Sequence, residues 1–413
     1  TYPHPSLQPV LERTLGIPLF QEQLLRMAMI AAGFSGGEAE ELRRAMGYKR
    51  SEKRMQEVEK KLRRGMGKKG ISGKAQEEIV RSITSFALYG FPESHAASFA
   101  LLAYASAYLK CHYLAAFTAA MLNNQPMGFY SPATLIKDAQ RHGLRVKPVD
   151  VLRSGWLCTL ERESKSWAVR LGMRYVKGLR EEIGKAIAAE RARSPFTSID
   201  DLAQRIPVMR KPELRMLAQV GALNWTGREA GNPREYSRAP YHRRDALWQA
   251  ERALRPAGPL LEKLEEPLPG SPLAPMTPEE RTVADFQSAG ITVGRHPMAY
   301  HRERLRARGV RTAVDLRRMA NGMQVTIAGA VICRQRPATA NGFLFLSLED
   351  ETGIANTIVT PDLFRSEHAV LVREPFLLIQ GKLQNQDQVI SVKAESVLSL
   401  ALTHAPSISH DFR

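Results

Sequence analysis

Cysteine is nearly absent from this sequence of 413 residues. The three cysteines, Cys111, Cys158 and Cys333, lie far apart, and none belongs to a Cys-x-x-Cys pair. This scarcity argues against a zinc site and a disulfide framework, and it fits a reducing compartment. Long apolar runs are missing as well, since no stretch approaches the roughly 18 residues of a membrane span and no charged-then-apolar leader opens the chain. We therefore expect a cytoplasmic protein with no membrane partner and no metal site of its own.

Acidic residues are too few to balance the basic ones. The chain has 59 Lys and Arg against 42 Asp and Glu, a net charge of +17. Residues 41–70 alone hold twelve Lys or Arg and four Glu, which leaves +8 in one short segment. Such a balance indicates a polyanionic partner, with nucleic acid first and a membrane surface second.

The length favours two to four domains. Apolar residues at spacings of three and four predict helices from residue 8 to about residue 125. Short alternating runs predict five strands between residues 323 and 400, with a helix between the third and the fourth, an order typical of an OB-fold barrel. We predict a multidomain chain, mainly α in its N-terminal region and ending in an all-β OB-fold barrel, with these parts: an all-α domain at 1–125, a connecting subdomain at 126–166, a helix-hairpin-helix DNA-binding domain at 167–225, a Pro/Gly-rich linker with short helices at 226–320, the OB-fold domain at 321–401 and a tail at 402–413.

A turn around Gly178 has the apolar frame of a helix-hairpin-helix. In that motif the N–H groups of the turn and of the next helix bind a DNA phosphate without reading bases. Lys177, Gly178 and Arg180 are therefore predicted to contact DNA, although Arg180 stands where a second glycine would help. The alternative is an ordinary pair of packed helices.

The predicted barrel is not basic. Residues 321–400 hold six Lys or Arg and eight acids, a net of −2. Arg334 and Arg336 are the candidates for single-stranded DNA, with Phe343 and Phe345 as stacking residues, and a structural or protein-contact role is the alternative. The acidic run 349–351 could hold Mg²⁺, but its place before Thr-Gly favours a solvated turn.

Two polar clusters lie in the helical N-terminal region. Arg43, Arg44 and Lys49 flank a glycine, where guanidinium forks and an ammonium can meet phosphates. Lys68 and Lys69 end the same basic segment and are predicted to contact DNA. Ser94 and His95 begin an apolar helix whose free N–H groups can bind a triphosphate. The alternatives are a solvated helix face for the cations, and a capping serine beside a packed histidine.

A family resemblance rests on five motifs in order. They are Pro9–Glu12, Phe20–Gln23, Leu42–Gly47, Tyr89–His95 and Tyr108–Lys110, and they resemble the fingers domain of the bacterial C-family DNA polymerase III alpha subunits. Replicative members usually carry Asn-Lys before the Ser-His pair, whereas this chain has Pro92-Glu93, as in the error-prone DnaE-type branch. The order fingers, helix-hairpin-helix, OB domain is also that of the family. Residues 1–125 then become the fingers domain, and the chain resembles the C-terminal half of such a polymerase.

The resemblance implies a function for the residues above. Arg43, Arg44, Lys49, Ser94 and His95 become candidates for the incoming deoxynucleoside triphosphate, and the DNA partner becomes a template-primer. The family's nucleotidyl transfer uses palm aspartates that hold Mg²⁺, and these precede the region seen here. We therefore expect no catalytic residue in this chain and no activity from it alone.

The expected protein partners follow from the same family. The linker offers only Gly258–Leu261 in place of a sliding-clamp peptide, so clamp contact is expected to be indirect, through accessory proteins of the same mutagenesis cassette. The alternative function is a non-enzymatic DNA-repair adaptor that bridges DNA and protein through its helix-hairpin-helix and OB domains.

Overall fold

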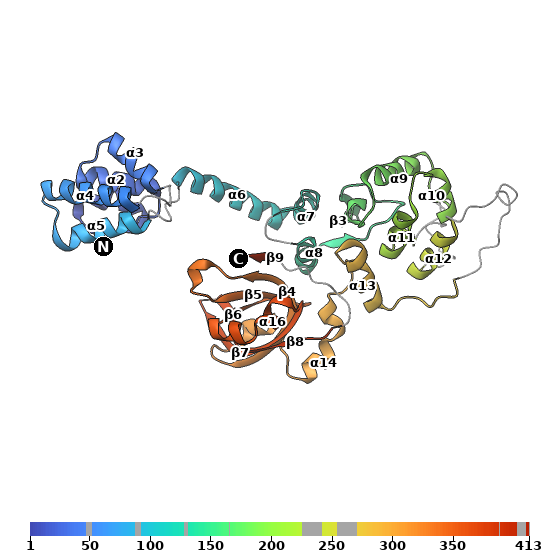
Figure 1. Cartoon of the computed structure of the whole chain (residues 1–413). Helices are drawn as coiled ribbons and strands as arrows, with labels where there is room; N and C mark the ends of the chain where they lie inside the picture. The colour runs from blue at the N-terminus through green and yellow to red at the C-terminus, as the bar shows by residue number, and fades with distance from the viewer. Residues whose placement is uncertain are drawn as a thin grey trace. The chain divides into compact units, whose positions relative to one another are not determined.

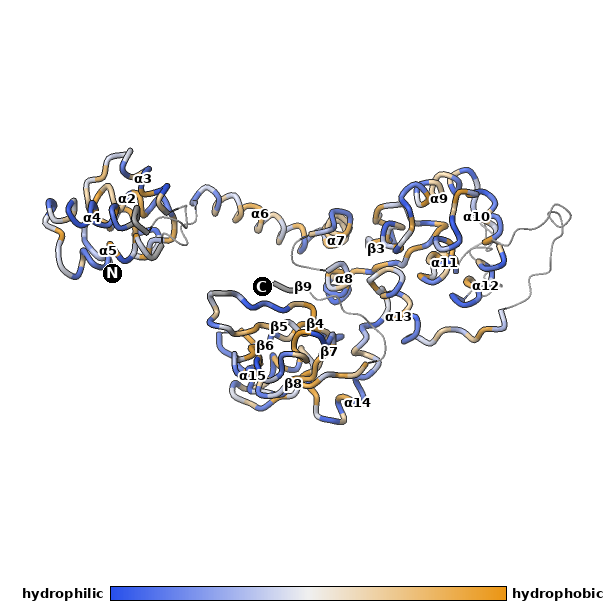
Figure 2. Tube along the Cα trace, in the orientation of Figure 1, coloured by the Kyte–Doolittle hydropathy of each residue, from blue (hydrophilic) through white to orange (hydrophobic). Residues whose placement is uncertain are grey.

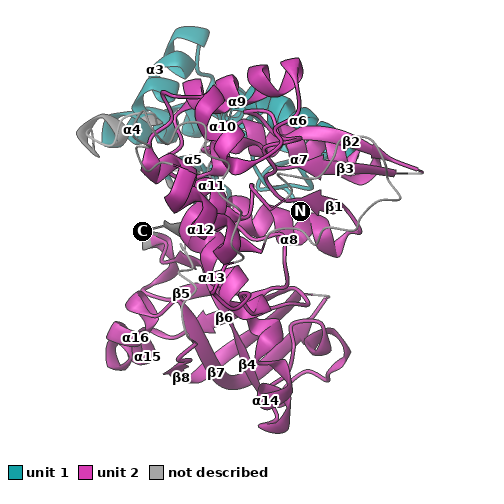
Figure 3. Ribbon diagram, turned by 90° about the vertical axis from the view of Figure 1, so that its right-hand side faces the viewer, with its two compact units in different colours: residues 1–108 teal, residues 109–413 magenta. Residues whose placement is uncertain are grey.

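The computed structural model divides the chain into two compact units, residues 1–108 and residues 109–413 (Figure 3). It describes residues 1–46, 52–86, 92–127, 131–164, 166–224, 242–253, 271–387, 389–402 and 410–412. The first unit has one apolar core, and the second has separate cores in its helical part and in its barrel.

The first unit is helical (Figure 1). A short turn of 3-10 helix, η1 (Pro5–Leu7), leads into α1 (Gln8–Leu11) and η2 (Glu12–Thr14). The longer helices are α2 (Gln21–Ala32), α3 (Gly36–Met46), α4 (Glu52–Lys68) and α5 (Gly73–Phe86). Their apolar faces meet in one core, which includes Leu24, Met27, Leu42, Leu62, Met66, Ile79 and Ile83. The apolar residues whose spacing predicted these helices are therefore the residues that the helices bury.

Helix α6 (Glu93–His112) runs across the boundary between the units. Hydrophobic and hydrophilic residues alternate along its length (Figure 2), and none of its residues is buried. Among the described residues, no helix is long and apolar enough to cross a membrane.

The second unit opens with two helices and a small sheet. Helices α7 (Leu114–Asn123) and α8 (Pro132–Arg141) precede β1 (Arg145–Lys147), β2 (Thr159–Glu163) and β3 (Ser166–Arg170). The strand order is β1-β3-β2, with β1 parallel and β2 antiparallel to β3.

Helices follow the sheet directly. After η3 (Met173–Tyr175) come α9 (Glu181–Arg193), α10 (Ile199–Arg205), α11 (Lys211–Val220) and α12 (Arg243–Ala253). They share one core with α7, α8 and the sheet, through residues such as Leu122, Ile136, Val169, Ile183, Leu202 and Leu217. The element before the turn at Gly178 is a three-residue 3-10 helix where a full helix was predicted.

Further elements lie within the stretch expected to be a linker with short helices. They are α13 (Pro278–Ala289), η4 (Pro297–Tyr300), α14 (Arg302–Ala307) and η5 (Asp315–Arg318). Thr277 caps α13 through the N–H of Glu280, and Ala289 and Ile291 join the core of the preceding helices.

A closed five-stranded barrel follows. Its strands are β4 (Gln324–Gln335), β5 (Leu344–Glu349), β6 (Ile354–Val359), β7 (Phe376–Gln386) and β8 (Val389–Ser399). The order is β5-β6-β8-β7-β4, and pairing of β4 with β5 closes the circle. Helices α15 (Pro361–Ser366) and α16 (His368–Arg373) stand between β6 and β7. The prediction of a helical region followed by an OB-type barrel is confirmed, and a short β9 (His410–Phe412) pairs with the end of β4.

Candidate nucleic-acid interface

The turn between η3 and α9 has the geometry of a phosphate-binding hairpin. Gly178 has a φ of +76°, and a side chain at this position would meet nothing within 4 Å. Among the described residues, no protein acceptor meets the N–H groups of Gly178, Glu181 and Glu182. The last two belong to the first turn of α9, where a helix end carries partial positive charge. The turn can therefore offer several N–H groups to one anion.

Arg180 ties this hairpin to a second turn. Its guanidinium donates to the carboxylate of Glu213, at 2.9 and 3.0 Å, and to the carbonyl of Val208 at 2.8 Å. Glu213 also accepts from the backbone N–H of Arg180 and of Arg210. Burial would raise the pKa of Glu213, but the Arg180 guanidinium and these N–H groups hold that pKa below its usual range. The two turns are thus held side by side by one buried carboxylate.

The second turn brings cations that the sequence pattern did not single out. It joins α10 to α11 and ends in Arg210 and Lys211, which are both exposed. Lys211 forms an ion pair of 2.9 Å with Glu251, whereas no acceptor meets the Arg210 guanidinium among the described residues. A tertiary contact, that of Arg180 with Glu213, places these cations beside the hairpin, so local sequence carries no signal for them.

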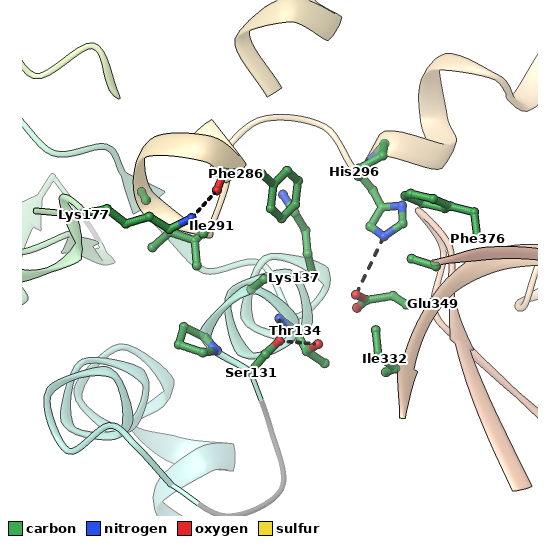
Figure 4. Close-up of a pocket in the computed structure, with 16 residues that line it drawn as sticks. Ser131, Thr134, Lys137, Lys177, Phe286, Ile291, His296, Ile332, Glu349 and Phe376 are labelled. Carbon is green, nitrogen blue, oxygen red and sulfur yellow. Dashed lines mark hydrogen bonds and ion pairs between the residues drawn. The ribbon is translucent and has the colours of Figure 1, made fainter. Parts of the chain in front are cut away.

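Lys177 forms hydrogen bonds within the protein through both its backbone and its side chain. Its backbone N–H donates to the carbonyl of Ser288 at 2.8 Å, and its ammonium donates to the carbonyl of Phe286 at 2.8 Å (Figure 4). This pair of bonds fastens the hairpin to α13. Gly178, the next residue, is left at the exposed tip of the turn.

A cavity of about 320 Å³ opens beside Lys177, between α8, α13 and the barrel. Its wall is mostly apolar, with Phe286, Ile291, Ile332 and Phe376, and it holds three ionisable groups besides Lys177 (Figure 4). The Lys137 ammonium donates to the carbonyl of Gly294 at 2.5 Å, and burial lowers the pKa of this lysine to about 8. On the other side of the cavity, Nε2 of His296 lies 3.7 Å from the carboxylate of Glu349.

The acidic run in the barrel is not a solvated turn, so that interpretation is wrong. Glu349 and Asp350 are buried. Glu349 pairs with Arg141 at 2.7 Å, and Asp350 accepts from the N–H groups of Ala313, Thr352 and Gly353. Glu351 pairs with Arg302. These carboxylates fasten the barrel to α8 and α14, and they are not free to hold a cation. Among the described residues, no group of three or more His, Cys, Asp or Glu could hold a metal ion.

The two arginines predicted for single-stranded DNA differ in exposure. Arg334 is buried and donates to the carbonyls of Leu371 and Glu374, both at 2.7 Å, so it caps the end of α16. Arg336 is exposed and lies over the ring of Phe364, with 4.4 Å between its Cζ and the ring centroid. The predicted stacking residue Phe345 is partly exposed on β5.

The candidate nucleotide residues belong to the first unit. Arg43 and Arg44 are exposed on α3 and pair with Glu40 at 2.6 and 3.3 Å. Ser94 and His95 are exposed in the first turn of α6, and the ring of His95 lies 4.4 Å from that of Phe99. Lys49, like the clamp-peptide position Gly258–Leu261, lies outside the described residues.

The remaining predicted DNA contacts are at the end of α4. Lys68 is exposed, whereas the ammonium of Lys69 donates to the carbonyl of Ile30 at 2.8 Å. The structure thus gathers Lys177, Gly178 and Arg180 in one turn, leaves the barrel arginines on a different element of the same unit, and carries the other candidates on the first unit.

Comparison with known proteins identifies relatives over nearly the whole chain. Residues 1–70 match the bacterial DNA polymerase III alpha subunit finger domain, and residues 143–231 match a helix-hairpin-helix motif. An error-prone DNA polymerase from Anaeromyxobacter dehalogenans is 45% identical over 98% of this chain and 35% of its own length. Those from Methylococcus capsulatus and Agrobacterium fabrum (error-prone DNA polymerase 2) are 42% and 40% identical, over 95% and 97% of this chain and 38% and 37% of theirs.

The chain therefore spans a little over a third of the length of these curated relatives. Among solved structures, an asparaginyl-tRNA synthetase from Pyrococcus horikoshii aligns over 24% of both chains, with 17% identity and a TM-score of 0.20, a likeness too slight to bear on the fold.

Proposed function

Because the chain belongs to the bacterial DNA polymerase III alpha-like family, in its error-prone branch, we propose that it is the DNA- and nucleotide-handling part of a translesion DNA polymerase. The second unit binds the backbone of the template-primer, and the first unit binds the triphosphate of the incoming deoxynucleotide. The observation that carries the proposal is the hairpin at Gly178, within the matched motif, where the N–H groups of Gly178, Glu181 and Glu182 meet no acceptor in the described part of the chain.

Phosphate contact at this hairpin needs no base recognition. Backbone N–H groups position a protein on the duplex and carry no direct sequence information. The exposed Arg210 adds a guanidinium fork beside the hairpin, and such forks suit phosphate oxygens. Glu181 and Glu182 would repel a phosphate, but ion pairs with Lys185 and Arg180 offset their charge. A polymerase that moves along its template requires contacts of this sequence-independent kind.

Arg43, Arg44, Lys49, Ser94 and His95 are proposed to bind the nucleotide. Glu40 sets the orientation of both arginines through its ion pairs, and the bonds from Arg43 in turn lower the pKa of Glu40 to about 2. A triphosphate carries more charge than one carboxylate, so it can compete for these guanidiniums. Ser94 and His95 supply a hydroxyl and an imidazole at the start of α6.

The nucleotidyl transfer itself is proposed to require Mg²⁺ held by aspartates of a palm domain. Metal ions neutralise the charge that develops on the phosphates during transfer. The carboxylates described above are already paired, so no step of that chemistry is assigned to them. Accessory proteins of the same mutagenesis cassette, rather than direct clamp contact, are proposed to bring the polymerase to DNA.

The test of the DNA site is a pair of glycine substitutions. Gly178→Val should lower the affinity for duplex DNA about tenfold, equally for unrelated sequences, because a side chain at the tip of the turn blocks the phosphate. Gly309→Val is the matched control, since Gly309 also has a φ of +76° and a side chain there would likewise meet nothing within 4 Å. Both variants carry the same backbone strain. Equal affinity of the two variants, measured by fluorescence anisotropy, would remove the hairpin from the DNA site.

The test of the nucleotide site uses the complete polymerase. Arg43→Ala should raise the KM for deoxynucleotides about tenfold or lower kcat, because a charge-assisted contact to the triphosphate is lost. Arg26→Ala on α2 is the control, since Arg26 is exposed and has no proposed role. Unchanged kinetics in Arg43→Ala would exclude this residue from the site.

A further inference from the structure

The hairpin formed by β2 and β3 has two faces of different chemistry. On one face, Glu161 and Glu163 pair with Lys147 at 2.8 and 2.9 Å, and Glu161 also pairs with Arg170. The opposite face carries the cross-strand pairs Leu160–Val169 and Arg162–Trp167. Val169 is buried in the core, whereas the pair Arg162–Trp167 lies nearer the turn that joins β2 to β3.

Trp167 is unusually open for an aromatic residue. Half of its surface is exposed, and Leu160, which precedes Arg162 on the same face of the hairpin, is exposed as well. The Cζ atom of Arg162 lies 5.7 Å from the centroid of the indole ring. Tryptophan is normally well buried, and an indole left open beside a guanidinium offers a flat apolar surface to a ligand.

Arg162 also differs from the cations around it. Arg145, Lys147 and Arg170 all pair with Glu161 or Glu163. Among the described residues, no carboxylate or carbonyl accepts a hydrogen bond from the Arg162 guanidinium, whose one recorded contact is the indole ring. A flat apolar ring beside a guanidinium that can still donate hydrogen bonds suits a ligand that is itself a flat ring linked to an anion. A nucleotide has this chemistry.

We propose that the β2–β3 hairpin is a stacking platform for one unpaired base of single-stranded DNA. The base lies on the exposed face of Trp167, and the Arg162 guanidinium binds the adjoining phosphate. This inference rests on the proposed function, in which the second unit binds a template-primer, and it adds a contact to the unpaired template. A base inside a duplex is stacked on both faces, so the platform selects single strands.

The experiment compares two tryptophan substitutions in the full chain. Trp167→Ala should weaken binding of a labelled single-stranded oligonucleotide at least fivefold, the loss expected for one stacked base, and leave duplex affinity unchanged. Trp248→Ala is the matched control, because Trp248 on α12 is exposed to a similar extent, 42% against 50%. Trp167→Phe keeps a stacking ring and should retain most of the affinity. Arg162→Ala should weaken single-strand binding and reduce its salt dependence by about one phosphate contact.

A second oligonucleotide identifies the base as the contact. In a strand of abasic sites, the loss caused by Trp167→Ala should disappear, since no ring remains to stack. The proposal is overturned if Trp167→Ala binds single strands as well as Trp248→Ala does, or if the loss is the same on the abasic strand. These outcomes differ from failure of the proposed function, in which the unaltered chain binds neither duplex nor single strand and Gly178→Val has no effect.

Discussion

Glu213 shows how much of the candidate DNA site depends on one side chain. Its buried carboxylate receives bonds from Arg180 and from two backbone N–H groups, and so it connects the hairpin at Gly178 with the start of α11. Glu213→Gln should lower the free energy of unfolding by about 1–3 kcal/mol, because charged hydrogen bonds to a buried group are lost. Chemical denaturation of the full chain measures this loss.

The same substitution should change the pH dependence of stability. The pKa of Glu213 is lowered in the folded chain, so its contribution is complete above its ordinary value of 4.5 and is lost as the pH falls through the folded pKa. The unaltered chain and Glu213→Gln should therefore differ in their free energy of unfolding by a constant amount above about pH 4.5. Below that pH the difference should become smaller. Glu182→Gln removes an exposed partner of the same arginine and should cost less than about 1 kcal/mol. A loss as large in Glu182→Gln would contradict this account.

Single residues divide into those that local sequence identifies and those that it does not. The turn at Gly178 could be predicted, because this glycine lies within the apolar frame of a helix-hairpin-helix. The hydrogen bonds that cations form with distant residues could not be predicted. Lys177 and Arg334 read as free charges in the sequence, but partners 109 and 37 residues away accept their hydrogen bonds. Arg210 was missed for the same reason, since its place beside the hairpin comes from the packing of α11.

At the scale of elements, α4 contains two glycines with opposite roles. A methyl group on Gly65 would lie 2.1 Å from the carbonyl oxygen of Ala32, so this glycine allows α2 and α4 to approach closely. A methyl group on Gly67 would meet nothing within 4 Å. Gly65→Ala should destabilise the chain by about 1–3 kcal/mol through overpacking. Gly67→Ala should be neutral or stabilise by up to about 1 kcal/mol, since alanine favours the helix.

Thermal denaturation followed by circular dichroism would compare the two variants. If both glycines tolerate alanine equally, the close approach of α2 and α4 does not hold the first unit together. Neither glycine belongs to the proposed nucleotide site, so the expected difference in stability does not depend on that proposal.

Elements with a strong local pattern could be predicted, and those defined by distant partners could not. The predicted strands of the barrel alternate apolar and polar residues, and the five observed strands lie between Gln324 and Ser399, within the predicted range 323–400. Strands β1 and β2 are different. β1 has three residues, two of them basic, and β2 reads Thr-Leu-Glu-Arg-Glu. Their pairing with β3 is stabilised by ion pairs between strands, which no period in a single segment reveals.

For the whole molecule, the distribution of charge matters more than its sum. The net charge of +17 is concentrated outside the barrel, which has a net of −2 over residues 321–400. Many cations of the second unit already form ion pairs with carboxylates of the same chain, for example Arg141, Arg180, Arg243 and Arg302. The positive charge left for the proposed DNA site is therefore smaller than the sum suggests, and its net excess lies outside the barrel.

This distribution makes a prediction for the full chain on a primer-template. The chain should bind it, and the affinity should fall steeply with salt, by about 10³-fold between 50 and 200 mM if six or more phosphates are contacted. It should not extend the primer in the presence of Mg²⁺ and deoxynucleotides, because nucleotidyl transfer needs carboxylates that hold the metal ions, and those of Glu349, Asp350 and Glu351 are engaged with Arg141, Arg302 and backbone N–H groups. Anisotropy titrations measure the binding, and a gel-based assay measures primer extension. Extension above that of a buffer control would show that the chain holds a metal site of its own, whereas tight binding without extension would place it as the part of the polymerase that positions DNA for chemistry performed elsewhere.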